Sequence, residues 1–220
     1  MNRVVALWHT SVGKKAVMAV TGIIMVAYLI THVLANLLAF QGPEQINAYS
    51  RFLYGTGGAL WAGRVVLLAA VLLHILAAVQ LTARRQAARP VGYAGGREAQ
   101  VSTFASRSIR WGGGLILVFL VYHILHFTLG TVHPSFVEGD PYHNVAAGFA
   151  TPPVVLFYEL AMAAVGLHLY HGIWSSGRSL GLSPPSPRPI RRQLALALAV
   201  IVWAGFSVIP IAVYAGVIRP

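Results

Sequence analysis

The sequence contains no cysteine and only five acidic residues among its 220 positions. Without thiolates, the chain itself can form no disulfide, no iron–sulfur cluster and no covalently attached c-type haem. Its 16 Lys and Arg residues fall mainly between long apolar runs, and no basic stripe with interleaved aromatic residues is present. We therefore expect no nucleic-acid partner, and any iron–sulfur chemistry would belong to another chain.

Charged residues are scarce, at 10% of the sequence, whereas 57% of the residues are hydrophobic. Such a chain has too little polar surface to cover a water-soluble globule, so a lipid bilayer is its expected solvent. Residues 1–10 are too few and too mixed in character for a signal peptide. The first apolar run is therefore expected to remain in the protein as a membrane helix.

Five apolar segments approach or exceed the ~20 residues that a helix needs to cross ~30 Å of hydrocarbon at ~1.5 Å per residue. The predicted membrane helices cover residues 16–40, 59–83, 111–132, 153–176 and 193–217. The connecting segments are rich in Gly, Pro, Ser or charge, as loops are. The sequence therefore predicts an all-α integral membrane protein, with residues 1–220 in one membrane domain built as a five-helix bundle.

The orientation in the membrane follows from the distribution of Lys and Arg, which collect in cytoplasmic loops. One side of the predicted bundle carries Arg3, Lys14, Lys15, Arg84, Arg85, Arg89, Arg97, Arg107, Arg110, Arg178, Arg188, Arg191 and Arg192. The other side carries only Arg51, Arg64 and Arg219. We expect a multi-pass protein of the cell (inner) membrane, with its N-terminus cytoplasmic and its C-terminus outside.

Several of the nine histidines lie inside predicted membrane helices, where a polar group needs a partner. They are His32, His74, His123, His126 and His168, with His171 toward the inner end of the fourth helix. Counted from the predicted helix ends, His32 lies ~24 Å and His123 ~18 Å from the cytoplasmic face, while His74 and His168 lie ~8–10 Å from it. The first and third helices thus supply an outer pair, and the second and fourth an inner pair.

Two imidazoles at one depth suit the two axial positions of a six-coordinate haem iron, and this ligation favours electron transfer over oxygen binding. An interhelical hydrogen bond is the alternative explanation for any one of these histidines. Zinc and copper sites usually recruit three or more protein ligands at one level. The bundle is therefore expected to enclose two b-type haems.

Five short motifs, taken in order along the chain, carry a family resemblance. They are T-H-V-L-A-N around His32, G-P-E-Q-I-N at residues 42–47, L-L-H around His74, R-W-G-G-G leading to Y-H at His123, and H-L-Y-H-G-I-W beginning at His168. Together they resemble the cytochrome b subunit of succinate:quinone oxidoreductases of the di-haem, five-helix class, over about residues 11–176. The resemblance implies that His32 and His123 ligate the outer haem and that His74 and His168 ligate the inner one.

Two of these ligand positions have alternatives one helical turn away. The depth of His126 matches that of His32 slightly better than the depth of His123 does, whereas the spacing from the glycines at 112–114 favours His123. His171 is the corresponding alternative to His168.

The resemblance also implies a function, in which the chain anchors a soluble pair of proteins and passes electrons between a docked iron–sulfur subunit and membrane quinone. FAD and the dicarboxylate site would lie on a flavoprotein partner, and the clusters on an iron–sulfur partner, because this chain has neither cysteine nor a G-x-G-x-x-G motif. The whole complex could form a higher oligomer. The alternative hypotheses are another di-haem b cytochrome, of the formate dehydrogenase, nitrate reductase or b561 type, and a haem-free transporter.

The segment before the first predicted helix is the candidate quinone site. Its Ser-x-x-Lys-Lys run, formed by Ser11, Lys14 and Lys15, looks like the start of related anchors, where a hydroxyl and a cation approach the quinone carbonyl. Ser11 and Lys14 would stabilise a developing oxyanion, with Trp8 and His9 near enough to stack or to relay a proton. Helix capping and the positive-inside rule explain the same residues equally well.

The remaining candidates are ionisable groups close to the membrane. Glu159 lies inside the fourth predicted helix near its outer end, where it would relay protons or face water. Lys15, Arg107 and Arg110 lie at the inner face, where they would bind haem propionates or anionic lipid, or serve topology alone.

Overall fold

The computed structural model describes residues 7–88, 103–182 and 189–219, and all regular secondary structure within these ranges is helical. Five helices in the described part of the chain are long and apolar enough to cross a membrane. They are α2 (Ser11–Leu37), α4 (Gly58–Ala87), α5 (Phe104–His123), α7 (Pro152–Ser179) and α8 (Pro189–Tyr214). The predicted all-α fold with five membrane spans is therefore confirmed.

Two of the long helices continue into a different helical geometry at one end. A 3₁₀ turn, η1 (Leu38–Gln41), follows α2, and a π-helical turn, η2 (Ile124–Thr128), follows α5. Two shorter helices, α3 (Pro43–Gly55) and α6 (Pro141–Gly148), lie in segments that the sequence analysis treated as loops. In each of these two helices a proline occupies the first turn, where its missing N–H is tolerated.

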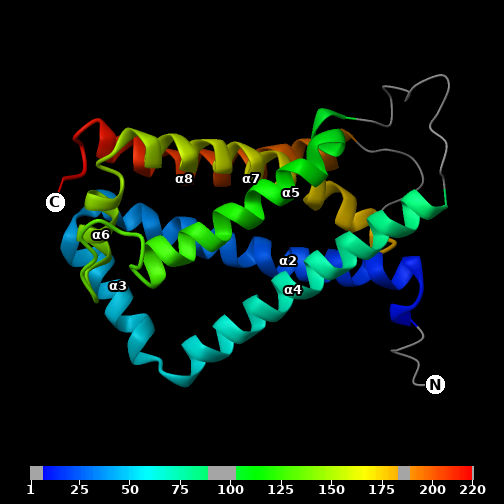
Figure 1. The fold of residues 1–220 in the computed structure, drawn as a ribbon, viewed down its shortest axis with the longest axis horizontal. Helices are drawn as coiled ribbons and strands as arrows, with labels where there is room; N and C mark the ends of the chain where they lie inside the picture. The colour runs from blue at the N-terminus through cyan, green and yellow to red at the C-terminus, as the bar shows by residue number, and fades with distance from the viewer. Residues whose placement is uncertain (1–6, 89–102, 183–188, 220) are drawn as a thin grey trace.

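The long helices lie side by side, and α2 lies at the centre of the bundle (Figure 1). Helix α2 packs against α4, α7 and α8, while α5 packs against α7, and α7 against α8. Both short helices and the C-terminus lie at one end of the bundle, and α2 begins at the opposite end (Figure 1). Four of these helices carry the candidate haem ligands. Among them α4 packs against α2, α5 packs against α7, and α2 and α7 pack against each other.

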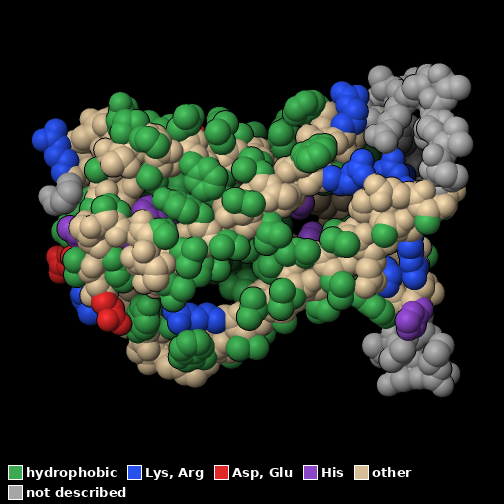
Figure 2. Space-filling model, viewed as in Figure 1, with side chains coloured by type: hydrophobic (Ala, Val, Ile, Leu, Met, Phe, Trp, Pro, Cys, Tyr) green, Lys and Arg blue, Asp and Glu red, His purple; other side chains and the backbone are tan. Residues whose placement is uncertain are grey.

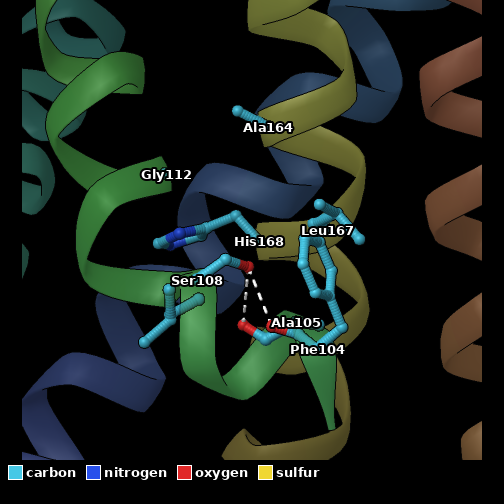
Figure 3. Close-up of a pocket in the computed structure, with 8 residues that line it drawn as sticks. Phe104, Ala105, Ser108, Gly112, Ala164, Leu167 and His168 are labelled. Atoms are coloured by element: carbon cyan, nitrogen blue, oxygen red, sulfur yellow. Dashed lines mark hydrogen bonds between the residues drawn. The ribbon is translucent and has the colours of Figure 1, made fainter.

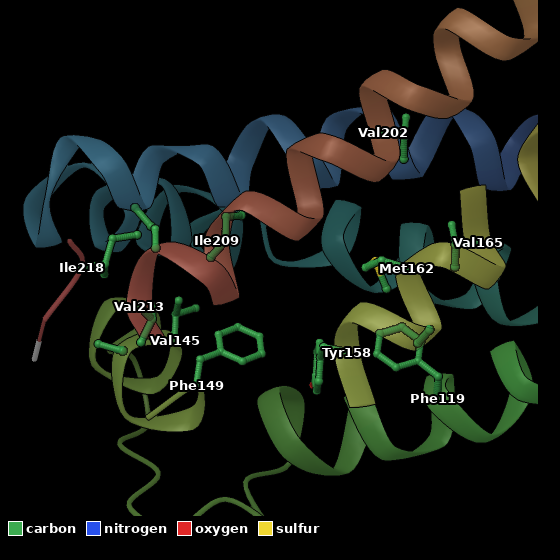
Figure 4. Close-up of a cluster of buried hydrophobic side chains, with 14 of the residues drawn as sticks. Phe119, Val145, Phe149, Tyr158, Met162, Val165, Val202, Ile209, Val213 and Ile218 are labelled. Atoms are coloured by element: carbon green, nitrogen blue, oxygen red, sulfur yellow. The ribbon is translucent and has the colours of Figure 1, made fainter. Parts of the chain in front are cut away.

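The packed core is narrow, because most of the large apolar side chains point outward (Figure 2). Where α7 meets α8, the core contains Met162, Val165 and Val202 (Figure 4). Small residues allow the helices to approach closely, as in other membrane bundles. A Cβ atom on Gly205 of α8 would lie 2.6 Å from Cγ2 of Val33 on α2. An outer surface of apolar side chains around a small-residue core is the pattern expected of a chain solvated by lipid.

Helices α2 and α5 begin five and seven residues earlier than hydropathy predicts. Helix α2 starts at Ser11 because the Thr10 hydroxyl accepts a hydrogen bond of 2.8 Å from the Gly13 backbone N–H. Helix α5 starts at Phe104, where the hydroxyl of Thr103 accepts from the Ser106 backbone N–H at 3.2 Å. The prediction that residues 104–110 form a loop was wrong, because the Thr103 cap starts the helix seven residues before its apolar part.

Hydrogen bonds between polar side chains and the backbone connect α3 and α6 at one end of the bundle. Asp140 caps α6 by accepting from the His143 backbone N–H at 3.0 Å, and it also accepts from the Asn47 side chain of α3 at 2.9 Å. Asn47 in turn accepts from the Tyr142 backbone N–H at 3.1 Å. The hydrogen bond from the His143 N–H lowers the pKa of the Asp140 carboxyl. The ionised carboxylate therefore ties the two short helices together.

We predict that Asp140→Ala loosens α6, because loss of an N-cap costs roughly 0.5–2 kcal/mol. Hydrogen exchange of the backbone amides of residues 141–148, followed by mass spectrometry in detergent, should quicken roughly twofold to thirtyfold, at ~1.36 kcal/mol per factor of ten. Asp140→Asn is the matched control, since asparagine caps helices about as well as aspartate.

The wild-type protection of α6 should also depend on pH. Because the folded pKa of Asp140 is depressed, the stabilisation is complete above the unfolded pKa of ~3.9 and is lost as the pH falls through the lower folded value. Asp140→Asn should show no such acid transition. Equal protection of α6 in the wild type and Asp140→Ala would contradict the capping role.

Candidate functional site

Four histidines from four different membrane helices meet in two pairs. The ring centroids of His74 on α4 and His168 on α7 are 6.1 Å apart, and those of His32 on α2 and His123 on α5 are 5.9 Å apart. At ~1.5 Å per residue, the first pair lies ~16–20 Å from the helix ends that face the N-terminal side of the bundle, and the second pair ~28–32 Å from them. These are the inner and outer pairs that the depth count predicted from the sequence.

The separation within each pair fits two imidazoles that share one metal ion. Metal–imidazole bonds are ~2.0 Å long, and a ring centre lies ~1.1 Å from its coordinating nitrogen, so two axial rings on one metal have centroids ~6 Å apart. Among the described residues, no three side chains of His, Cys, Asp or Glu converge into a metal-binding group. The histidines therefore meet two at a time, as axial haem ligation requires.

One ring of the inner pair, that of His74, contacts a hydroxyl group on α2. Oγ1 of Thr21 on α2 lies 3.1 Å from Nδ1 of His74, and the same hydroxyl lies 2.8 Å from the carbonyl oxygen of Val17. His168 differs, because its Nδ1 is buried and has no hydrogen-bond partner among the described residues. The two rings of the inner pair therefore have different surroundings.

A tyrosine hydroxyl contacts one ring of the outer pair, that of His123. The hydroxyl of Tyr158 on α7 lies 3.4 Å from Nδ1 of His123 and 3.1 Å from Nδ1 of His126. A hydroxyl has one proton, so Tyr158 donates to one of these rings and accepts from the other. The His32 ring stacks on Tyr28 with centroids 5.2 Å apart.

The structure separates His126 from His123, although they are only one turn apart. His126 lies in the π-helical turn η2 and is 1% exposed, within a cluster of aromatic rings. Its ring contacts Phe127 at 4.2 Å and His133 at 4.9 Å between centroids. His123 is the residue that the structure places beside His32. On α7, the structure likewise places His168 beside His74, with His171 one turn further along and partly exposed.

Open space adjoins the inner pair. Figure 2 shows the surface hollowed between α4 and α5, with histidine side chains visible inside the hollow. A cavity of about 100 Å³ between α5 and α7 is lined by His168, Gly112 and Ser108 (Figure 3). The His168 ring points toward α5, and a Cβ atom on Gly113 would lie 4.0 Å from its Cε1. The cavity beside His168 is therefore lined mainly by apolar residues, with Gly112 and the Ser108 side chain among them.

The residues proposed for quinone binding lie together at the start of α2. Lys14 is buried, and its ammonium group donates to the Trp8 carbonyl oxygen at 2.7 Å and lies 4.1 Å from the centre of the Trp8 ring. Arg84 at the end of α4 donates to the Ser11 hydroxyl at 3.4 Å and to the His9 carbonyl oxygen at 3.0 Å. No local sequence pattern links Arg84 to this group, because the contact joins positions 73 residues apart.

The other basic candidates lie at the same end of the bundle. Lys15, Arg107 and Arg110 are exposed there, the two arginines within the first turns of α5. Arg178 and Arg192 lie over the Trp174 ring at 5.3 and 4.5 Å. Figure 2 shows Lys and Arg side chains gathered at this end and acidic side chains at the opposite one. Arg3, Arg89, Arg97 and Arg188 from the predicted basic side lie outside the described residues.

Glu159 lies near the opposite end of the bundle. It lines a cavity of about 230 Å³ together with Leu156 and Tyr214, between α7 and α8. Its Oε1 atom is buried and has no hydrogen-bond partner among the described residues. A carboxyl group next to a cavity in this position can exchange protons with water that enters from that side.

Comparison with known proteins identifies one family. Residues 86–208 match the family model for the succinate dehydrogenase/fumarate reductase transmembrane subunit. The matched region includes His123 and His168 and covers more than half of the chain. No curated protein and no solved structure matches the chain significantly. Because the family match covers more than half of the chain, the chain belongs to the succinate dehydrogenase/fumarate reductase transmembrane subunit family.

Proposed function

We propose that this chain is the di-haem cytochrome b anchor of a succinate:quinone oxidoreductase, and that it passes electrons between a docked iron–sulfur subunit and membrane quinone. The observation that carries the proposal is the pairing of four histidines from four helices, at two depths, with ring separations of 5.9 and 6.1 Å. Family membership makes the chain a membrane subunit of an enzyme complex with soluble partner subunits. The haem ligands and the quinone site are the parts that we add.

Two pairs of histidines would each hold one haem. His74 and His168 would ligate the inner haem, and His32 and His123 the outer one. A haem iron held by two histidines would supply one-electron transfer. The side chains around each pair would orient the rings. The Tyr158 hydroxyl contacts Nδ1 of the His123 ring, so it would help to set the orientation of that ring.

The partners would dock at the basic end of the bundle. This end carries the exposed arginines of α4, α5 and α7 and the half-buried arginines of α8, and the positive-inside rule assigns it to the cytoplasm. The inner pair lies nearer to this end than the outer pair does, so an electron from a docked iron–sulfur protein would have the shorter path to the inner pair. The flavoprotein, with FAD and the dicarboxylate site, would be bound through that iron–sulfur protein.

Quinone would bind at the same end, beside Ser11 and Lys14. A hydroxyl and a buried ammonium group next to a tryptophan ring can donate hydrogen bonds to a quinone oxygen while the ring contacts the quinone face. His9 is exposed and close enough in sequence to exchange a proton with water. Glu159 would serve as a separate proton exchange group at the opposite side of the membrane.

We predict that His74→Ala and His168→Ala each remove one haem and spare the other, because the remaining imidazole cannot close both axial positions. His32→Ala and His123→Ala should each remove the second haem. The measurement is the haem content of the purified complex together with its reduced-minus-oxidised optical spectrum.

His126→Ala is the matched control for helix α5, since its ring faces Phe127 and His133 rather than His32. It should retain both haems. Loss of the outer haem in His126→Ala, with both haems retained in His123→Ala, would move the ligand by one turn.

We further predict that Ser11→Ala and Lys14→Met lower quinone reduction while haem content and succinate oxidation by an artificial dye stay nearly unchanged. A hydrogen bond to a developing oxyanion contributes about 1.5–3 kcal/mol, which corresponds to roughly tenfold to hundredfold in rate. Quinone and dye reductase activities are measured in the same preparations.

Val12→Ala serves as the control for this segment, because Val12 is exposed next to Ser11. It should leave both activities as in the wild type. Unchanged quinone reduction in both Ser11→Ala and Lys14→Met would place the quinone site elsewhere, and the cavity beside Glu159 would be the next to test.

A further inference from the structure

We propose that Thr21 is a positioning residue for the inner haem, because it fixes the proton of the His74 ring on Nδ1 and so leaves the lone pair of Nε2 for the metal. The inference rests on the proposed function, in which His74 and His168 share one haem iron. It assigns a role to a side chain outside the motifs that the sequence analysis singled out.

The hydrogen bonds of Thr21 determine which group donates. The Thr21 hydroxyl lies 2.8 Å from the Val17 carbonyl oxygen and 3.2 Å from that of Met18, both on its own helix. Carbonyl oxygens only accept, so the single hydroxyl proton is directed to α2 itself. The remaining lone pairs of Oγ1 can then only accept at the 3.1 Å contact with His74. His74 Nδ1 therefore carries the proton.

The surroundings keep this contact in place. Thr21 is 5% exposed at the closely packed interface of α2 and α4. A Cβ atom on the adjacent Gly22 would lie 3.5 Å from Cε1 of His74, so the ring rests directly against the backbone of α2. Rotation of the ring by half a turn would remove Nδ1 from the Thr21 hydroxyl.

A hydrogen bond donated by the non-coordinating nitrogen makes an imidazole a more basic metal ligand. A more basic ligand stabilises ferric iron more than ferrous iron. Because Nδ1 of His168 has no partner among the described residues, this effect acts on the inner pair through His74 alone. We therefore expect Thr21 to lower the reduction potential of the inner haem.

The test compares Thr21→Val with the wild-type complex in a redox titration followed by optical spectroscopy. The inner haem is the component that His74→Ala lacks. Loss of such an outer partner typically weakens metal binding about tenfold to hundredfold. A tenfold loss confined to the ferric form corresponds to a rise in potential of ~59 mV for a one-electron couple. Thr21→Ser should restore the wild-type value, since it keeps the hydroxyl.

Thr31→Val is the matched control on the same helix, because Thr31 is exposed and its hydroxyl donates to the Tyr28 carbonyl oxygen. It should leave the inner potential unchanged. If Thr21→Val does not accumulate, Thr21→Ala and Thr21→Ser provide the same comparison. The role of the hydroxyl would be overturned if Thr21→Val kept two haems with an unchanged inner potential, or if Thr21→Ala and Thr21→Ser shifted the inner potential equally. Either result would leave the proposed function intact. A wild-type complex without haem would instead overturn the proposed function.

Discussion

The arrangement of this protein depends on the cost of placing an imidazole in hydrocarbon, where a ring nitrogen without a partner is unfavourable. Five histidines lie in the middle parts of membrane helices. The rings of His74, His123 and His126 contact nearby hydroxyl groups, whereas Nδ1 of His168 has no partner among the described residues. A shared metal ion would provide a partner for one nitrogen of each paired ring. The packing of α2, α4, α5 and α7 can be understood as the geometry that allows both kinds of partner at two depths.

Helix α2 has the largest share in this geometry. It contributes His32 to the outer pair and Thr21 to the ring of His74, and its first turn holds the polar group of Ser11 and Lys14. Arg84 links the end of α4 to this first turn, so the candidate quinone region and the inner pair are built on the same two helices. A displacement of α2 against α4 would therefore change the surroundings of both groups of residues.

The sequence was sufficient for the five membrane helices and for which histidines share a depth, because hydropathy and helical rise depend only on position along the chain. It was insufficient for the start of α5, where the Thr103 cap extends the helix over a seven-residue segment with four polar residues, and for the helices α3 and α6, which are short and only weakly apolar. The choice between His123 and His126 depended on the directions of two side chains one turn apart, next to a π-helical turn. The contacts of Thr21, Tyr158 and Arg84 join distant segments, which no local pattern encodes.

The central claim is that each pair of histidines holds one haem by bis-imidazole ligation. Electron paramagnetic resonance of the purified, oxidised complex, combined with the ratio of haem to this chain, tests it most directly, because two axial imidazoles make ferric haem low-spin. Our account predicts two low-spin ferric haems per chain and no high-spin component in the intact protein. A haem-free complex with full quinone reductase activity, or a single high-spin haem, would contradict it.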